Sequence, residues 1–376
     1  MKIENIIKKV FIIVFFTIIS FFMVTTIFNN DKISYVERRK LETFPKFKIE
    51  NLVSKDYYEQ LTKAFSDQLE LREYLVKGYF LFQFQRYFGD VVEGENKQLY
   101  SASQVNQGST YYKNLEEVAQ EINEESKKID AKFIFVSVPR KDAYMTKELP
   151  KTYNSSLKTY QKSVNIMKTN LDKNIIFIDA IEVFKQSGIY NCYYSNDHHV
   201  TPRCAYELQK EINKNTGTIN YELEEVFKIK QTIVNGAYNR QLGQKVKADK
   251  EDLYLVPKQK INYTRYENNV KSNEKIYGKG NTYEDAYMEG DKAFTRIETN
   301  NEGKNIMFVG SSYTNIQEAL SVPNYKRVVS IDYRHNKTGN KINYYVKKYN
   351  IDYVIFMPSQ STNAFSINQI RLHLGK

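Results

Sequence analysis

The chain has 376 residues, of which 41% are hydrophobic and 26% charged, and its formal net charge is +11. This length and composition are typical of one large globular domain or two ordinary ones and exclude a disordered chain. The positive charge favours an anionic neighbourhood, such as acidic lipid heads or acidic wall polymers, and the dispersed lysines argue against nucleic acid as a partner. Abundant Lys, Asn, Ile and Tyr also fit the bias of an AT-rich genome, which explains the charge without any partner.

The N-terminal part of the chain carries one long apolar segment. Val10–Phe28 has 19 residues without a charge, and a bilayer core needs about 20 helical residues. Lys2, Lys8 and Lys9 precede this segment, which predicts a cytoplasmic tail at 1–9, a transmembrane anchor at 10–28 and the rest of the chain outside the cytoplasm. Because large apolar residues continue to the end of the segment, a cleaved signal peptide is the less favoured alternative. The expected location is the cell membrane, in a single pass.

The remaining chain changes pattern at about residue 91. Residues 29–90 predict a connector with amphipathic helices, because Leu61, Phe65 and Leu69 recur at helical spacing. Beyond it, at 91–376, short apolar runs alternate with helical stretches. The runs predicted as buried strands are 133–139, 175–179, 306–310, 327–332 and 353–358, and the predicted helices are 115–128, 157–171 and 341–349. This alternation indicates a mostly parallel sheet covered on both faces, a three-layer α/β/α domain. Residues of about 220–300 break the rhythm and predict an insertion or side lobe.

The stretch YSNDHHVTPRC places two of the four histidines behind an aspartate and just ahead of a helix. Thr201 suits the N-cap of that helix and Pro202 its first position. If the preceding loop is extended, alternation predicts that Asp197 and His199 face each other while His198 points away. Such a pair would hold the imidazole in one tautomer for base catalysis. A loop histidine without a catalytic role is the alternative, and a metal site is disfavoured because no ligand spacing is recognisable.

A strand–glycine–serine–helix pattern follows in NIMFVGSSYTN. Here a buried strand ends at Gly310, and Ser311 and Ser312 lie at the turn into a helix. This arrangement displays a nucleophilic serine at the carboxyl edge of a parallel sheet. The alternative is that one of the two serines only caps the helix.

The two cysteines bracket the histidine motif. Outside the cytoplasm, Cys192 and Cys204 are able to form a disulfide that pins the loop between them. Two buried free thiols are the alternative, and the spacing does not decide between these interpretations.

Further motifs occur in an order known from one family. ERRKLETFP, FSDQLELREYL, GENKQLY, VSVPRKDAYM, DHHVT and GSSY follow one another along the chain. In this order and spacing the chain resembles, over nearly its whole length, the DHHW protein family. That family is related to the alginate O-acetylation proteins (AlgJ/AlgX-like) of the SGNH-hydrolase superfamily. The resemblance implies an SGNH-hydrolase-like fold and the transfer or removal of O-acetyl groups on a cell-surface polysaccharide through a serine ester.

Carried over by position, the resemblance implies Ser312 as nucleophile, His199 as base and Asp197 as the residue that orients the base. Substrate or oxyanion contacts are expected from nearby motif residues, namely Gly310, Ser311, Arg140, Lys141 and Tyr144. No cofactor and no metal are expected. The implied partners are the polysaccharide, the membrane and a membrane-bound acyltransferase that delivers acetyl groups.

The chain departs from the family pattern around these residues. Val200 replaces the motif tryptophan, Ser311 replaces the aspartate of G-D-S, and Lys97 and Gln98 replace a glycine and a tryptophan. These departures keep a second hypothesis open, that of a non-catalytic accessory or glycan-binding protein of cell-envelope polysaccharide modification. A general structural protein of the envelope is a third and weaker hypothesis.

Overall fold

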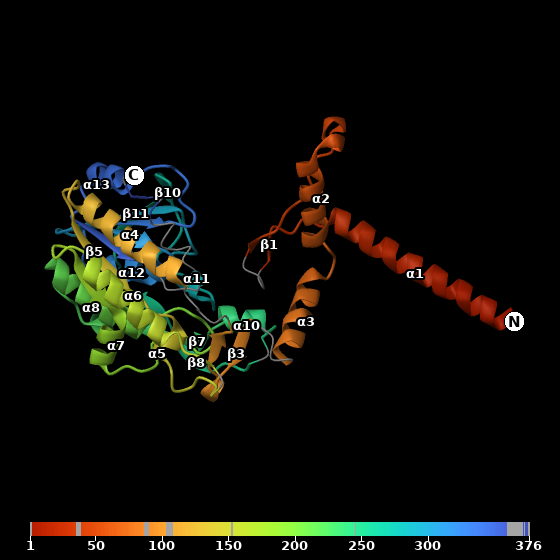
Figure 1. The fold of residues 1–376 in the computed structure, drawn as a ribbon, viewed down its shortest axis with the longest axis horizontal. Helices are drawn as coiled ribbons and strands as arrows, with labels where there is room; N and C mark the ends of the chain where they lie inside the picture. Colours follow the sequence, from red (N-terminus) through yellow and green to blue (C-terminus); the bar gives the residue numbers. More distant parts are fainter. Residues whose placement is uncertain are drawn as a thin grey trace. The chain divides into compact units, whose positions relative to one another are not determined.

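The computed structural model describes residues 2–34, 39–85, 90–102, 108–151, 153–244, 246–358, 371 and 373–374. The chain divides into two compact units. The first unit comprises Met1–Asp90 and Arg240–Lys245, and the second comprises Val91–Asn239 and Val246–Lys376. Each unit is described separately (Figure 1).

The first unit is mainly helical. Its elements are α1 (Lys2–Phe28), β1 (Ile33–Ser34), β2 (Arg39–Lys40), the 3₁₀ helix η1 (Ile49–Val53), α2 (Lys55–Asp67) and α3 (Arg72–Gln85). Within α1, Ile6–Phe28 has a mean hydropathy of 2.7 and is long and apolar enough to cross a membrane. Gln68, at the end of α2, donates its side-chain N–H groups to the carbonyls of Asp31 and Glu42. The turn between α2 and α3 is thereby tied to the chain that leaves α1.

The second unit is built on an eight-stranded sheet with the strand order β10-β9-β11-β13-β12-β14-β5-β6. The pairs from β13 through β12, β14 and β5 to β6 are parallel, and the pairs among β13, β11, β9 and β10 are antiparallel. The strands are β5 (Lys132–Ser137), β6 (Ile176–Asp179), β9 (Tyr263–Glu267), β10 (Val270–Ser272), β11 (Phe294–Thr299), β12 (Asn305–Gly310), β13 (Arg327–Asp332) and β14 (Tyr353–Met357). All five strands predicted from apolar runs are present.

Helices cover both faces of this sheet, because alternate residues of each buried strand point to opposite sides. On one face, Ile134, Phe308 and Ile355 pack in a core with residues of α7 (Ala180–Ser187), α8 (Pro202–Thr216) and α12 (Tyr313–Ser321). On the other face, Phe135, Val309 and Phe356 pack with residues of α4 (Ser109–Ser126), α6 (Leu157–Asn170) and α13 (Ile342–Tyr349). The predicted three-layer α/β/α fold is confirmed.

The region predicted as a side lobe at 220–300 is only partly separate from the sheet. Its first half forms a hairpin of β7 (Phe227–Ile233) and β8 (Lys250–Pro257), whereas β9, β10 and β11 extend the main sheet. The polar composition concealed this, since antiparallel strands at a sheet end are half exposed and lack a continuous apolar run. The remaining elements are β3 (Val91–Glu93), η2 (Glu95–Lys97), β4 (Leu99–Ser101), α5 (Lys141–Tyr144), α9 (Leu223–Val226), α10 (Ala237–Gln241) and α11 (Tyr283–Ala286).

Candidate active site

The loop that carries Asp197 and His199 is closed at its base. Cys192 and Cys204 form a disulfide, with a Cα–Cα distance of 5.3 Å. Beside it, Tyr193 and Val200 form an antiparallel bridge, and the Thr201 N–H donates to the Cys192 carbonyl at 2.8 Å. The loop between these contacts is therefore a short closed ring rather than an open connection.

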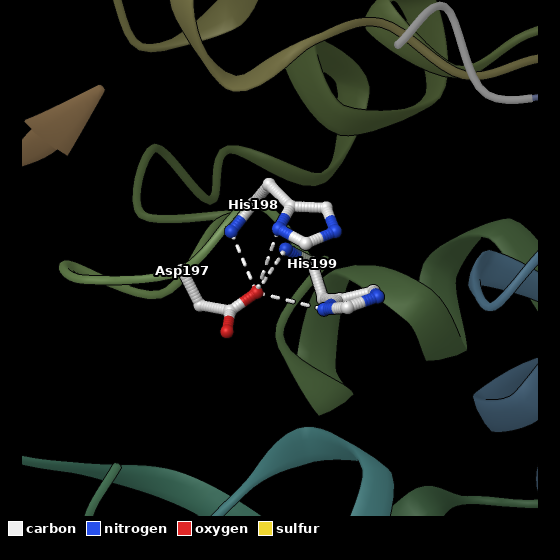
Figure 2. Close-up of side chains that lie close together, drawn as sticks. All are labelled: Asp197, His198 and His199. Carbon is white, nitrogen blue, oxygen red and sulfur yellow. Dashed lines mark hydrogen bonds and ion pairs between the residues drawn. The ribbon is translucent and has the colours of Figure 1, made fainter. Parts of the chain in front are cut away.

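Asp197 organises the polar groups of this loop and is fully buried (Figure 2). Its Oδ1 accepts the backbone N–H groups of His198 and His199, at 2.6 and 3.1 Å, and lies 2.7 Å from His199 Nδ1. Its Oδ2 accepts the Ala237 N–H at 2.6 Å. With four such contacts the carboxylate is held in one position, and its bond to Nδ1 orients the imidazole.

His198 corrects the prediction that it points away from Asp197. Its Nδ1 lies 3.2 Å from Asp197 Oδ1, and its ring centroid is 4.0 Å from that of His199. The cause is the backbone, which bends at 197–199 instead of running extended, so side-chain alternation does not apply. His198 is the more exposed histidine, with a side chain 25% exposed, whereas that of His199 is fully buried.

Ser312 lies two residues after the end of β12 and faces the second nitrogen of the same imidazole. Its Oγ is 2.9 Å from His199 Nε2, which is the geometry of a hydroxyl donating to a neutral histidine whose Nδ1–H donates to Asp197. Ser312 occupies the N-cap position of α12, yet its side chain makes no capping hydrogen bond. The alternative that this serine merely caps the helix therefore has no support in the geometry.

The turn between β12 and α12 requires a residue without a side chain at Gly310. A Cβ on this residue would lie 2.4 Å from Thr314 Cγ2 and 2.9 Å from the Met357 carbonyl oxygen. The start of α12 and the end of β14 both approach the backbone here, so only glycine fits. Its neighbour Ser311 is buried, and its carbonyl accepts the Thr314 N–H at 2.8 Å.

Lys141, which the resemblance places at a substrate or oxyanion, is buried against the backbone of the loop. Its Nζ donates to the carbonyls of Leu99, Tyr194 and Ser195 at 2.8, 2.7 and 2.6 Å, an arrangement that uses all three protons of an ammonium. Burial lowers the pKa of Lys141 to about 7, against the opposing charges of Glu251 and Asp197. The lysine thus fixes the loop from below.

The other two residues expected near a substrate also have structural partners. Arg140 is buried and forms an ion pair with Asp142, whose Oδ1 is 2.7 Å from Arg140 Nε. The Tyr144 hydroxyl donates to the Ile189 carbonyl at 2.7 Å, and its ring packs on Phe184. Neither contact brings these side chains to Ser312.

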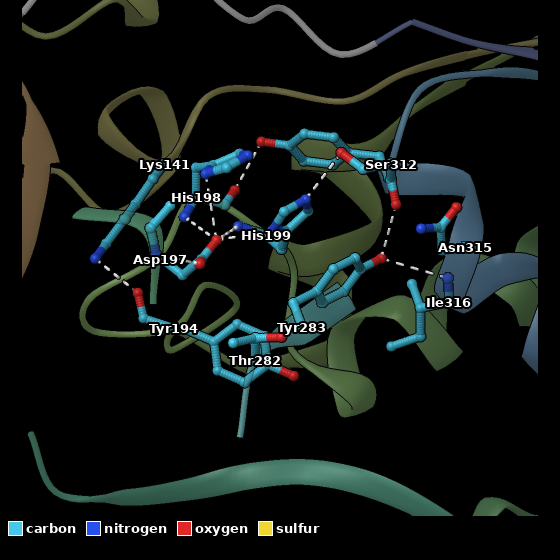
Figure 3. A network of polar contacts seen from close by, with 12 residues as sticks. Lys141, Tyr194, Asp197, His198, His199, Thr282, Tyr283, Ser312, Asn315 and Ile316 are labelled. Carbon is cyan, nitrogen blue, oxygen red and sulfur yellow. Dashed lines mark hydrogen bonds and ion pairs between the residues drawn. The ribbon is translucent and has the colours of Figure 1, made fainter. Parts of the chain in front are cut away.

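Two tyrosines that sequence analysis did not identify, Tyr283 and Tyr313, enclose His199; Tyr283 is labelled in Figure 3. Tyr283 stacks on the imidazole, with ring centroids 3.8 Å apart and planes inclined by 4°. Tyr313 lies 5.2 Å from it and donates its hydroxyl to the His198 carbonyl. Burial raises the pKa of both phenols well above the usual value, so both remain protonated. Tyr313 directly follows the GSS turn and was identifiable by position, whereas nothing in the sequence around Tyr283 indicates the site.

Metal binding competes with these contacts. Ligand atoms of Asp197, His198 and His199 lie within 4.8 Å of one another. However, Nδ1 of His199 is hydrogen bonded to Asp197 and Nε2 to Ser312. A metal ion held by His199 would have to displace one of these two partners.

The chain matches no family model and no curated protein. Among solved structures, it is similar to a DHHW family protein from Eubacterium siraeum, with a TM-score of 0.58 and 20% identity over 76% of this chain and 96% of that one. It is also similar to Bacillus cereus PatB1 with a sulfonyl adduct, with a TM-score of 0.60 and 18% identity over 74% and 97% of the two chains. The O-acetyltransferase domain of Pseudomonas putida AlgJ matches less well, at a TM-score of 0.45 and 13% identity over 75% of this chain and 98% of that one. The chain therefore has the α/β fold of the DHHW family protein and of PatB1, and the DHHW resemblance in its motifs is confirmed at the level of the fold.

Proposed function

We propose that the protein is a membrane-anchored, extracytoplasmic serine enzyme that transfers or removes O-acetyl groups on a cell-surface polysaccharide. The observation that carries this proposal is the continuous hydrogen-bonded series from Asp197 through His199 to Ser312. It has the order and the distances of an acid–histidine–serine triad. The acetyl group and the polysaccharide are inferred from the motif resemblance.

In the proposed reaction, Ser312 Oγ attacks the carbonyl carbon of an acetyl ester while His199 Nε2 takes the hydroxyl proton. Asp197 holds the Nδ1–H and stabilises the imidazolium that forms. When the carbon–oxygen bond of the leaving alcohol breaks, His199 returns the proton to that alcohol and acetyl-Ser312 remains. A sugar hydroxyl or water then attacks this ester through the same base. Helix α12 begins beside Ser312, and the positive end of its dipole favours the developing oxyanion.

The cellular location rests on the first unit and on the disulfide. The apolar part of α1 is preceded by lysines, which favours a cytoplasmic N-terminus. A disulfide beneath the catalytic loop is typical of a compartment outside the cytoplasm. We expect a membrane-bound acyltransferase as the source of acetyl groups, since no acyl-carrying cofactor is implied by the motifs.

The proposal is tested by measuring how the full-length protein, kept in detergent, reacts with an acetate ester and with a serine-directed probe. Wild type should hydrolyse a small aryl acetate and should be labelled at Ser312 by an aryl sulfonyl fluoride, detected by peptide mass spectrometry. Ser312→Ala should abolish both reactions, His199→Ala should be equally damaging, and the double variant should be scarcely worse, because members of a triad act as a unit.

Ser311→Ala is the matched control, since it removes a neighbouring hydroxyl from the same turn and should only reduce the rate. Activity that survives Ser312→Ala and is lost in Ser311→Ala would show that the wrong hydroxyl had been assigned. A wild-type protein inert towards acetate esters and sulfonyl probes would overturn the enzymatic proposal and favour a non-catalytic accessory protein that binds glycan.

A further inference from the structure

We propose that Tyr283, which lies between β10 and β11, is a positioning residue. It fixes the orientation of the His199 imidazole and the position of the Ser312 backbone. The proposal builds on the function proposed above and identifies how that site is held. Tyr283 begins the short helix α11, and its side chain is 1% exposed. It has one contact with each of the two residues between which the proton moves.

The first contact is made by the ring. At 3.8 Å between centroids and 4° between planes, the phenol covers one face of the His199 imidazole. The imidazole edge is fixed by Asp197 at Nδ1 and by Ser312 at Nε2, so the ring contact removes the remaining freedom to tilt. The electron-rich face of an aromatic ring also attracts a cation, and the imidazole is cationic after it takes the serine proton.

The second contact is made by the hydroxyl. Tyr283 Oη donates to the Ser312 carbonyl at 3.0 Å and accepts the Ile316 N–H at 3.3 Å (Figure 3). In an uninterrupted helix the N–H of a residue donates directly to the carbonyl four positions earlier, which for Ile316 is Ser312. The phenol thus bridges Ile316 and Ser312 in the first turn of α12, where the Ser312 carbonyl also accepts the Asn315 N–H at 3.2 Å. The backbone of the nucleophile is positioned by this hydroxyl instead of by the helix alone.

A second tyrosine of the same region supplies a matched comparison. Tyr277 donates its hydroxyl to the Ala319 carbonyl at 2.8 Å, about two turns beyond the Ser312 carbonyl along α12. It has the same chemistry and the same helix partner but no contact with His199 or Ser312 among its hydrogen bonds. Tyr277→Phe therefore reports the general cost of losing one phenol that supports α12.

The proposal predicts different results for the two functions of Tyr283. Tyr283→Phe keeps the ring and loses the bridge, so that Ile316 and Ser312 are free to pair directly and Oγ shifts. We expect kcat to fall by about tenfold, the value of roughly one lost hydrogen bond, with little change in KM and none in the pH profile. Tyr283→Leu also removes the ring, and the acid limb of the pH–rate profile should move down by roughly 0.5 to 1.5 pH units.

A shift of the acid limb in Tyr283→Leu can be assigned to the loss of the phenol ring only if the other groups that face His199 are unchanged. They are Asp197 and His198 from its own loop, Ser312 and Tyr313 from the start of α12, and Tyr283 itself. None of the first four is altered in the Tyr283 variants. Circular dichroism and thermal unfolding of each variant check that the fold is retained.

The experiment combines kinetics with a direct titration of the full-length protein in detergent. Because the chain has only four histidines, selectively labelled imidazoles are resolvable by NMR, and His199→Gln assigns the relevant signal. Support for the proposal is a lower kcat in Tyr283→Phe but not in Tyr277→Phe, together with a lower pKa of His199 in Tyr283→Leu. Wild-type kcat in Tyr283→Phe, or an unchanged imidazole titration in Tyr283→Leu, would overturn it. If the wild type proves inert, the enzymatic proposal fails, while the His199 titration still decides whether Tyr283 sets the imidazole.

Discussion

Replacing Gly236 by alanine should damage the candidate site from a position that bears no functional group. Gly236 lies against the backbone of the loop that carries Asp197 and His199. A Cβ on it would be 2.1 Å from Asn196 Oδ1 and 2.2 Å from the Asn196 carbonyl oxygen. These are far inside contact distance, and one of the atoms is backbone, so either the loop or residues 236–237 must move apart. The next residue, Ala237, donates the N–H that holds Asp197 Oδ2 at 2.6 Å.

The size of the effect follows from these two contacts. Overpacking of this kind costs about 1–3 kcal/mol in the free energy of unfolding. A hydrogen bond to a charged group is worth about 1.5–3 kcal/mol. If that amount is lost from the orientation of Asp197, kcat falls by roughly 10- to 150-fold. KM should change little, because Gly236 lies behind Asp197 and not beside Ser312.

The assay is aryl-acetate hydrolysis or sulfonyl labelling of full-length Gly236→Ala, alongside its thermal unfolding. Gly108→Ala is the control, since this glycine is the N-cap of α4 at an ordinary φ of −72° and a Cβ there meets nothing within 4 Å. The control should match wild type in rate, with a loss of stability of at most about 1 kcal/mol because alanine is a poorer N-cap than glycine. A Gly236→Ala protein with wild-type kcat would refute the reasoning that the Ala237 contact orients Asp197.

Three further results are expected. Replacing both Cys192 and Cys204 by serine should lower the free energy of unfolding by about 3 kcal/mol for a loop with a sequence separation of 12, measured by denaturant titration; alkylation of both thiols in unreduced, unfolded wild type would contradict the bridge. Burial raises the pKa of Glu318 to about 7, so the folded chain keeps a proton that the unfolded chain releases, and wild type should lose thermal stability from pH 5 to pH 8. Glu318→Gln should show a smaller loss, and equal slopes for the two proteins would contradict this origin. A chain that starts at Asn30 should be soluble, and its retention on membranes after a salt wash would disprove a single anchor.

The sheet core was predictable because its strands are buried on both faces. Runs such as FIFVSVP and YVIFMP leave no alternative to a covered parallel sheet, and the structure has β5 and β14 at these places. The half-exposed strands β9, β10 and β11 have no comparable run and were assigned to a side lobe. A strand that is buried on both faces has a continuous apolar run that can be recognised in the sequence. A strand that is buried on one face at the end of a sheet has a mixed sequence that resembles a polar loop.

Within the candidate site, local motifs indicated residues but not their surroundings. The motifs DHHVT and GSSY selected Asp197, His199 and Ser312, which the fold brings together. The motif also selected Lys141, but the sequence did not indicate its contacts, since a lysine that binds three carbonyls looks the same in sequence as one that binds a substrate. Tyr283 was not selected at all, because its two contacts are long-range and the chain has 31 tyrosines.

At Lys97, one of the departures from the family pattern, the backbone has a conformation that glycine favours. Lys97 stands where the resemblance expects a glycine, and its φ is +59°, in the left-handed region. This conformation costs a non-glycine residue about 1–2 kcal/mol, and the side chain reaches Asp249 at 2.9 Å. The backbone at position 97 therefore has the left-handed conformation that glycine favours, although a lysine stands there.

The central place of β14 also determines when a site of this kind comes into existence. In the sheet, β14 lies between β12, which leads to Ser312, and β5, which leads to Lys141 and the carbonyls beneath the catalytic loop. A nascent chain that has emerged only as far as α13 already contains all three triad residues, but it lacks the strand that joins the two halves of the sheet. Long-range pairing of this kind is slow and comes late in folding. Before Tyr353–Met357 enters the sheet, the sheet does not join these two halves, and the approach of Ser312 to His199 depends on helix contacts such as that of Gln317 in α12 with the Ala205 carbonyl in α8.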